Sequence, residues 1–405
     1  MKRFAMLFMG MLALVGCSDD DNDKSRNERK PIVLDQQQKS AVEAANDIAV
    51  VAFDAAYNAS RNNAFSPLSV NMGVSMMANG AAGETLDHMV SVLAPGGSLA
   101  TLNSLNAKLA EELPKADAKS TVRIANSMWL DKTMEADGAF RKAISDYYGA
   151  ELRSYDKNDR EKAAAMVNEW VSKATKGEIP ELVKSGDITS VALANAIYFK
   201  GEWPDKFDGA KGQPDEFTNI DGSTSTVTFM NGRQYGTYGE INGTRFASIF
   251  FGNKSFSITF ILPAEGKSPA EALKHFHNRP DFSASTDELE TGVAAIIDMK
   301  LPRFSIRQHH KLKNVYEADG MPLAEGMSFG GIVKSGSIGI TDIIHECKVT
   351  VDEDGAVVVA STYVPGELTL TNDYHTKIEF DRPFAFIISE TSTGLYMFMG
   401  SANML

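Results

Sequence analysis

From about Gln38 onward the chain has one uninterrupted globular pattern, and this continuity limits the possible folds more than any single motif does. Early segments such as SAVEAANDIAVVAFDAAYN space their apolar residues at helical intervals. Later runs are apolar and β-rich, and Gly, Pro or charged residues bound them: TVRIANSMWLDK, SVALANAIYFKGEW, SFSITFILP and AAIIDMKLPRFSI. No long Pro/Gly/Ser linker and no internal repeat separates the two kinds of segment. The order predicts one large α+β domain over residues 38–405, with its helices concentrated in the N-terminal part.

Length and charge narrow the class of protein. With 405 residues, of which 43% are hydrophobic, the chain can bury a large core. Acidic residues outnumber basic ones by 53 to 40, which is unfavourable for binding a polyanion. We therefore expect no nucleic-acid partner.

The N-terminus has the pattern of a targeting signal. Lys2 and Arg3 form a positive region, Phe4 to Val15 an apolar one, and LVGC places a small residue directly before Cys17. This resembles a bacterial lipobox, which implies that residues 1–16 are a lipoprotein signal peptide and that lipid is attached to the Cys17 sulfur. An ordinary secretory signal, with Cys17 incidental, is the alternative. With Cys17 lipidated, Cys347 has no disulfide partner, and we expect it to be a small buried residue.

Residues 17–37 are polar and charged and are predicted to be an acidic flexible tether. Asp19, Asp21 and Asp23 alternate as in calcium loops, but the loop glycine and the distal Glu are missing, so no metal site is predicted. An acidic run behind a lipidated cysteine also resembles the surface-export signals of some Gram-negative lipoproteins. We expect an exported lipoprotein of the outer membrane, held at the cell surface by its N-terminal lipid.

Isolated serines and histidines raise the question of a hydrolase. The candidates for a triad are Ser66, Ser69, His88, His309, His310 and His345. The sequence has no GxSxG elbow, no HExxH motif and no cysteine pair for zinc. Ser66 and Ser69 flank Pro67 at a predicted helix start, where hydroxyls ordinarily cap backbone amides. The pair His309-His310, followed by two lysines, is predicted to be a solvated charged face rather than a small polyanion site.

Five segments in order resemble the serpin family, and the resemblance covers nearly all of Gln38 to Leu405. They are NAFSPLSV (Asn63 to Val70), NEWVSKATKGEI (Asn168 to Ile179), NAIYFKGEW (Asn195 to Trp203), MKLPRFSI (Met299 to Ile306) and FDRPFAFIISETSTGLYMFMG (Phe380 to Gly400). The resemblance implies the serpin fold, with a helix-rich N-terminal part, three β-sheets and an exposed reactive-centre loop at about residues 353–376.

The resemblance also implies roles for single residues. Ser66, Ser69 and Asn195 match the serpin shutter, which lies beneath the place where the main sheet opens. His345 and Trp203 match the breach, where the loop first enters the sheet. Judged alone, His345 at the edge of a predicted strand would be a satisfied core histidine.

The segment VDEDGAVVVASTYVPGELTLTNDY (Val351 to Tyr374) corresponds to the loop. The hinge residues are Glu353, Gly355, Ala356, Val358, Ala360 and Thr362. Both alternating sets of residues from Ala356 to Val364 are uncharged, so the segment has the composition of a strand that can enter a sheet. Valines at 357–359 replace the alanines usual in inhibitory members, and Pro365 lacks a ladder donor. The valines predict slower insertion, and both departures predict that a larger fraction of the inhibitor is cleaved as a substrate.

Two counts locate the bond offered to a protease. Counting roughly fourteen residues past Gly355, by resemblance to serpin loop lengths, reaches Thr369, whereas counting backward from FDRPF reaches about Asn372. We favour cleavage after Thr369 or Leu370, with Leu368 and Asn372 as the neighbouring candidates. No Lys or Arg occurs from Gly355 through Thr376, so elastase-like or chymotrypsin-like pockets fit better than one with an acidic anchor. Papain-like cysteine proteases are a further target class.

The predicted function is a suicide inhibitor of serine proteases that works by covalent attachment and loop insertion, as a monomer and without a cofactor. The alternative is a non-inhibitory binding protein with the serpin fold, which the valine-rich hinge would suit. A hydrolase is a third hypothesis, supported only by the isolated serines and histidines.

Overall fold

The computed structural model describes residues 29–204, 206–207, 212–279, 292–313, 329–336, 338, 343–356 and 374–405. The predicted signal peptide, Cys17 and the acidic run behind it lie outside the described residues, as do residues 357–373 with the candidate reactive bonds. Within these ranges, no helix combines the length and the apolar character needed to cross a membrane.

Helices dominate the first part of the chain, as expected, and local capping chemistry explains where they begin. Ser66 Oγ accepts from the Ser69 N–H at 3.3 Å, and Pro67 takes the first helical position, where its missing N–H costs nothing. Asp35 and Ser98 each form a capping box. The described α-helices are α2 (Gln36–Ala56), α3 (Pro67–Ala78), α4 (Gly83–Leu93), α5 (Leu99–Glu112), α6 (Gly138–Tyr148), α7 (Arg160–Ala174) and α8 (Pro269–His277), with short 3-10 turns η1 (Leu113–Lys115), η2 (Ser185–Asp187) and η3 (Gly330–Ile332).

Two separate helices, α3 and α4, follow the predicted helix start at Pro67. The break lies at residues 79–82, and Gly83 at the start of α4 has a φ of +55°. A Cβ on Gly80 would stand 2.2 Å from Ile332, so the chain turns where another segment packs closely against its backbone. Sequence periodicity alone does not show such a contact.

The largest sheet has nine described strands, in the order β1-β15-β14-β8-β7-β6-β9-β13, with β5 on the edge of β6. Only the β13–β9 pair is parallel among them. Their bounds are β1 (Asn63–Phe65), β5 (Gln213–Thr218), β6 (Thr224–Ile241), β7 (Thr244–Phe251), β8 (Phe256–Leu262), β9 (Val293–Pro302), β13 (Tyr374–Glu379), β14 (Phe384–Glu390) and β15 (Tyr396–Ala402).

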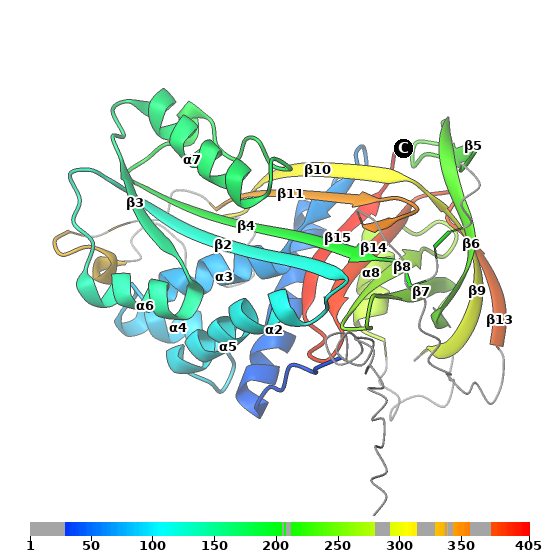
Figure 1. Ribbon diagram of the computed structural model, residues 1–405, viewed down its shortest axis with the longest axis horizontal. Helices are drawn as coiled ribbons and strands as arrows, with labels where there is room; N and C mark the ends of the chain where they lie inside the picture. The colour runs from blue at the N-terminus through cyan, green and yellow to red at the C-terminus, as the bar shows by residue number, and fades with distance from the viewer. Residues whose placement is uncertain are drawn as a thin grey trace, which may run out of the picture.

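Two smaller sheets lie next to each other. One has the order β12-β4-β2-β3, and the other is the pair β10-β11. Their bounds are β2 (Ser120–Asp131), β3 (Glu151–Tyr155), β4 (Val191–Glu202), β10 (Phe304–Lys311), β11 (Ile344–Val351) and β12 (Gly355–Ala356). β4 and β11 run side by side in the same direction (Figure 1), yet no backbone ladder joins these two described strands.

Both faces of β4 are covered. Ile197 and Phe199 point into the main core, where α3 packs, and the alternate residues Ala194 and Ala196 point into a second core beneath α7. This follows from the two-residue period of a strand. In Figure 1, α7 lies on one side of the β2–β4 layer, and α3 lies on the other.

The predicted run AAIIDMKLPRFSI splits into β9 and β10 at Arg303, and the two strands belong to different sheets. Pro302 ends the pairing of β9 with β6. Because proline has no N–H to donate, a ladder commonly stops there.

The domain begins earlier than the predicted boundary at Gln38. Ile32 and Leu34 are buried in the main core, the Ile32 N–H donates to Ser392 Oγ at 2.8 Å, and Lys108 Nζ donates to the Val33 carbonyl at 2.6 Å. Residues 29–37 are therefore part of the folded domain rather than of a tether. Charged neighbours in the sequence gave no sign that Ile32 and Leu34 would be buried, because their burial depends on contacts with distant parts of the chain.

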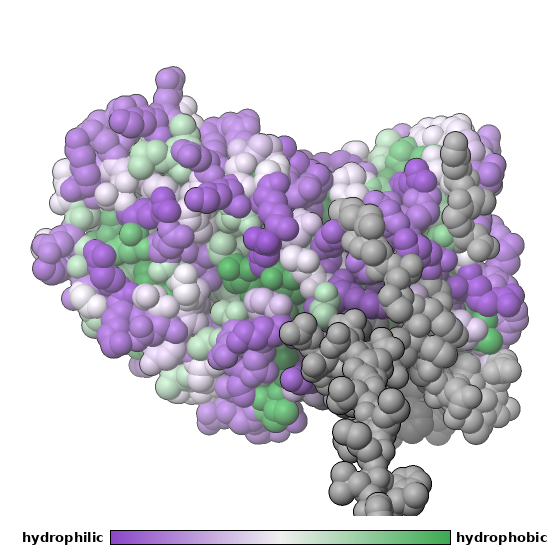
Figure 2. All heavy atoms as spheres, in the orientation of Figure 1, coloured by the Kyte–Doolittle hydropathy of each residue, from purple (hydrophilic) through white to green (hydrophobic). Residues whose placement is uncertain are grey.

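The α+β fold class, with its helix-rich N-terminal part and three sheets among the described strands, is confirmed. Figure 2 shows that hydrophilic residues cover most of one face of the molecule, with smaller hydrophobic areas between them.

Candidate functional site

A tight turn connects β11 to β12 at the predicted hinge. The N–H of Asp352 donates to the Gly355 carbonyl at 3.0 Å, and the Gly355 N–H donates back to the Asp352 carbonyl at 3.2 Å. The Asp354 N–H also donates to Asp352 Oδ1 at 3.0 Å, which closes a side-chain turn. The chain therefore reverses direction within four residues.

Beyond the turn, the chain pairs with β4 instead of leaving the molecule. Gly355 lies opposite Glu202, and Ala356 lies opposite Gly201, in antiparallel register. Gly355 has a φ of +127°, and a Cβ on it would stand 2.2 Å from the Gly201 carbonyl oxygen. Both the backbone conformation and the close approach require glycine here. Of the other predicted hinge residues, Val358, Ala360 and Thr362 lie outside the described residues.

Three side chains from two segments hold the hinge turn. The Trp203 Nε1–H donates to the Asp352 carbonyl at 2.8 Å, Arg303 Nε donates to Glu353 Oε1 at 2.7 Å, and Lys206 Nζ lies 3.3 Å from Asp354 Oδ1. The hydrogen bond with Glu353 raises the pKa of the Arg303 guanidinium, and burial raises the pKa of the Asp352 carboxyl. Trp203 thus lies where the resemblance placed it, at the entry to the sheet.

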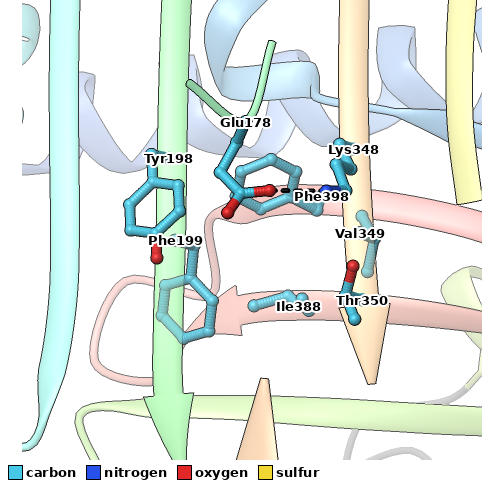
Figure 3. A pocket seen from close by; sticks show the side chains of 8 residues that line it. All are labelled: Glu178, Tyr198, Phe199, Lys348, Val349, Thr350, Ile388 and Phe398. Atoms are coloured by element: carbon cyan, nitrogen blue, oxygen red, sulfur yellow. Dashed lines mark hydrogen bonds and ion pairs between the residues drawn. The ribbon is translucent and has the colours of Figure 1, made fainter. Parts of the chain in front are cut away.

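A small cavity lies between β4 and β11. Figure 3 shows Tyr198 and Phe199 on the β4 side, Lys348, Val349 and Thr350 on the β11 side, Ile388 and Phe398 on the strands behind, and Glu178 between the two strands. Its volume of about 40 Å³ has room for about three waters. A cavity of this size is too small to be a small-molecule site, since such sites occupy hundreds of Å³.

The predicted shutter residues lie between α3 and β4, away from the hinge turn. Ser66 Oγ donates to the Met397 carbonyl at 2.8 Å, and the Ser69 hydroxyl donates to Asn195 Oδ1. Asn195 Nδ2 in turn donates to Asn126 Oδ1 on β2. The two hydroxyls are therefore used in capping and in joining helix α3 to the sheet, which agrees with the capping hypothesis.

His345 belongs to this cluster and not to the entry where Trp203 lies, which corrects the predicted pairing of these two residues. The Ser66 backbone N–H donates to His345 Nε2 at 3.0 Å, and Phe65 packs edge-on against the imidazole. The physical reason is strand geometry: six residues of β11 separate His345 from Val351, where the hinge turn begins, which is about 20 Å. That spacing was visible in the sequence and would have placed the residue correctly.

Burial, with smaller contributions from the neighbouring His310 and His309, lowers the pKa of His345 to about 3. Because Nε2 accepts a backbone hydrogen bond, the neutral ring is the form that fits. His345 is stacked with His310, whose Nε2 donates to the Ala64 carbonyl at 2.8 Å. This geometry gives His345 a structural role, as a satisfied core histidine.

The prediction of a solvated face at His309-His310 is only half confirmed. His309 is exposed and its Nδ1 lies 3.0 Å from the buried carboxylate of Glu346, whereas His310 is 8% exposed and points into the core. Successive residues of a strand point to opposite faces, so the two histidines enter different environments. Cys347 is buried, as predicted, and its burial raises the pKa of the thiol. In the described ranges, no group of three His, Cys, Asp or Glu side chains could hold a metal ion.

Sequence analysis missed two parts of the site. Arg303 is one of three charged residues in the run AAIIDMKLPRFSI, and the local sequence did not single it out as a functional position. Glu178 and Lys348 form an ion pair of 2.5 Å over the cavity, although 170 residues separate them. No local pattern could have linked two residues so far apart.

Comparison with known proteins assigns the chain to a family. The family model described as Serpin (serine protease inhibitor) matches residues 43–404, so the chain belongs to the serpin family. Serpin-Z7 of Hordeum vulgare is 30% identical over 364 residues, which is 85% of this chain and 90% of that protein.

Solved structures agree. The thermophilic serpin Tengpin in its native state has a TM-score of 0.78 and 26% identity, covering 94% of this chain and 98% of that one. Arabidopsis AtSerpin1 in its native stressed conformation has a TM-score of 0.78 and 24% identity, covering 91% and 98%. Family and fold support protease inhibition in general.

Proposed function

We propose that this protein is a covalent, loop-inserting inhibitor of serine proteases with elastase-like or chymotrypsin-like pockets, and that papain-like cysteine proteases are a further target class. The observation that supports this most is the pairing of Gly355 and Ala356 with β4 at the entry to the opening. The loop thus starts next to two described strand edges, on β4 and β11, that no ladder joins to each other. We call the gap between these two edges the opening. Unpaired edges of this kind accept an added strand.

The two registers at the hinge predict where an entering strand would lie. Gly355 opposite Glu202 and Asp352 opposite Gly355 set its alignment with β4 and β11. Continued along both strands, the alignment places Val358 between Phe199 and Val349. It places Thr362 between Asn195 and His345, so the predicted shutter lies level with the middle of the inserted segment.

The cavity has room for the side chain of Val358, one of the valines that depart from the family pattern. Phe199, Val349, Ile388 and Phe398 line it, and they surround the place that the register assigns to Val358. A valine there would fill existing space and bury apolar surface. The bulk of this hinge residue is thus accommodated, whereas Pro365 still lacks one ladder donor.

The free energy released by loop insertion would be large enough to trap a protease. About a dozen new ladder bonds at ~1 kcal/mol net each, with buried valines at ~1.5 kcal/mol or more each, exceed about 10 kcal/mol in total. About fourteen residues at roughly 3.3 Å per residue would carry an attached protease about 45 Å along the sheet. The native form would then persist as a kinetic trap until the loop is cut.

The loop composition supports the target class. Gly355 through Thr376 contain no Lys or Arg, and the candidate bonds follow Thr369 or Leu370. An apolar or small side chain enters a hydrophobic protease pocket, whereas an acidic pocket would be left unpaired.

Incubation of the full-length protein with chymotrypsin, elastase and trypsin, followed by a denaturing gel, tests the proposal. A covalent band with chymotrypsin or elastase, and none with trypsin, is the expected result. Thr362→Asp would bring a charge between Asn195 and His345 and should yield cleaved protein without the band. Thr224→Asp is the control for the added charge, because Thr224 is exposed at the start of β6 and lies outside the loop.

If no neutral protease gives a covalent band and loop cleavage leaves the melting temperature unchanged, the proposal fails. The non-inhibitory binding protein then becomes the better hypothesis.

We also propose that the protein is an outer-membrane lipoprotein exposed at the cell surface and anchored through Cys17. The support is the lipobox-like LVGC and the acidic run after it. Metabolic labelling with a radioactive fatty acid should mark the wild type and leave Cys17→Ala unmarked. Equal labelling of both chains would contradict the anchor.

A further inference from the structure

The loop after α7, residues 178–187, crosses the opening between β4 and β11, and we call it the strap. Its attachment to α7 is firm. Asn168 Oδ1 accepts from the N–H groups of Leu182 and Val183 at 2.8 and 3.0 Å, and Asn168 Nδ2 donates to the Val183 carbonyl at 2.8 Å. Ile179, Leu182 and Val183 are buried in the second core, beside β2 and β4. The strap should therefore move together with α7 and β4.

Three polar contacts join the strap to the opposite side. Lys348 Nζ on β11 lies 2.5 Å from Glu178 Oε2, Arg307 Nη2 on β10 donates to the Glu181 carbonyl at 3.1 Å, and Lys311 Nζ on β10 lies 2.8 Å from Asp187 Oδ1. Figure 3 shows the Glu178–Lys348 pair between the two strands. These contacts hold β10 and β11 to the β4 side where no backbone ladder does so.

The Glu178–Lys348 pair lies early on the path of an entering strand. The hinge register places Val359 opposite both Tyr198 and Lys348, three residues past Ala356. Neighbouring strands are ~4.8 Å apart, so one added strand moves β11 away from β4 by about that distance. A contact of 2.5 Å cannot persist through such a displacement, because Glu178 remains with α7 and Lys348 moves with β11.

We propose that the Glu178–Lys348 ion pair is a latch that limits the rate at which a strand enters the sheet. The inference rests on the proposed function and deepens it, by naming a contact that must break for the strand to enter. The two side chains are 41% and 32% exposed, so salt screens the pair. Removal of the pair should speed entry by between about twofold and about fivefold, the range expected for a partly exposed ion pair.

Uptake of a synthetic peptide tests the latch independently of protease trapping. The peptide GAVVVASTYVPGEL, residues 355–368, is added to the full-length protein, and the fraction with a raised melting temperature is followed over time. Lys348→Gln and Glu178→Gln should each take up the peptide faster than wild type at low salt. The charge-swapped double variant, Glu178→Lys with Lys348→Glu, should return towards the wild-type rate.

The matched control is Lys132→Gln, which removes the exposed Lys132–Asp156 pair of 2.6 Å on the β2–β3 side, away from the opening. It should leave the uptake rate unchanged. Raising NaCl to 500 mM should speed uptake by wild type and by Lys132→Gln more than uptake by the two latch variants, which keep the Lys311–Asp187 pair but lack the latch.

Equal uptake rates in all chains, or slower uptake in the latch variants, would overturn the latch and leave the proposed function standing if the covalent band forms. No uptake by any chain, together with an unchanged melting temperature after loop cleavage, would overturn both.

Discussion

The carbonyl oxygen of Gly201 lies 2.2 Å from the position that a Cβ on Gly355 would occupy. Two glycines on adjacent strands thus bring the hinge backbone against β4, and the φ of +127° at Gly355 adds a second requirement for glycine. The pairing of β12 with β4 depends on this contact.

Gly355→Ala should therefore lower the free energy of unfolding by more than the ~1–3 kcal/mol typical of a strained backbone conformation. Urea denaturation measures the change. Gly222→Ala is the control, because Gly222 has a φ of +82° and no atom within 4 Å of an added Cβ, so it reports the backbone cost alone. Equal losses in the two variants would contradict a steric role for Gly201.

Arg303 and Glu353 should be energetically coupled. The side chains are 45% and 20% exposed and share a charge-assisted hydrogen bond of 2.7 Å, so we expect a coupling of about 1 kcal/mol. A double-mutant cycle with Arg303→Gln and Glu353→Gln measures it. Lys206→Gln, which removes the more exposed contact to Asp354, should cost less. Additive effects of the first two substitutions would show that the pair does not hold the hinge turn.

Acid should destabilise the fold through His345. Its pKa is about 3 in the folded chain and about 6.5 when unfolded, so between these values only the unfolded state binds the proton. The contribution is complete above about pH 6.5, and it is lost as pH falls toward 3, at up to about 1.4 kcal/mol per pH unit. His310, whose pKa burial also lowers, adds a loss of the same sign.

Urea denaturation of wild type and His345→Gln between pH 4.5 and pH 8 checks this. The curve for His345→Gln should be flatter, whereas His88→Gln, on an exposed part of α4, should follow wild type. Parallel curves for wild type and His345→Gln would contradict the assignment.

Cys347 should be unreactive while the protein is folded. The residue is 2% exposed, and burial raises the pKa of its thiol, so both access and the thiolate form are disfavoured. In a Cys17→Ser chain, Cys347 is the single thiol, because the sequence has two cysteines. A disulfide reagent at pH 8 should label it only after denaturant is added. Rapid labelling without denaturant would show that β11 opens readily.

Much of the fold was predictable from local pattern. The helix start at Ser66 and Pro67, the strands β2, β4 and β8, and the turn at Gly355 follow from capping, two-residue alternation and glycine chemistry. The failures have a common cause. Ile32 and Leu34 are buried and His310 is enclosed because of neighbours that are distant in the sequence.

By itself, the sequence determined the type of most elements, the presence of a glycine at the predicted hinge and the absence of basic residues in the loop. These properties depend on neighbouring residues and on side-chain chemistry alone. Only the tertiary structure decided that Ser66 binds His345, that Arg303 holds Glu353 and that Glu178 reaches Lys348 across an opening. Contacts over 50 to 279 residues depend on how whole sheets and helices pack, and a sequence pattern does not encode that distance.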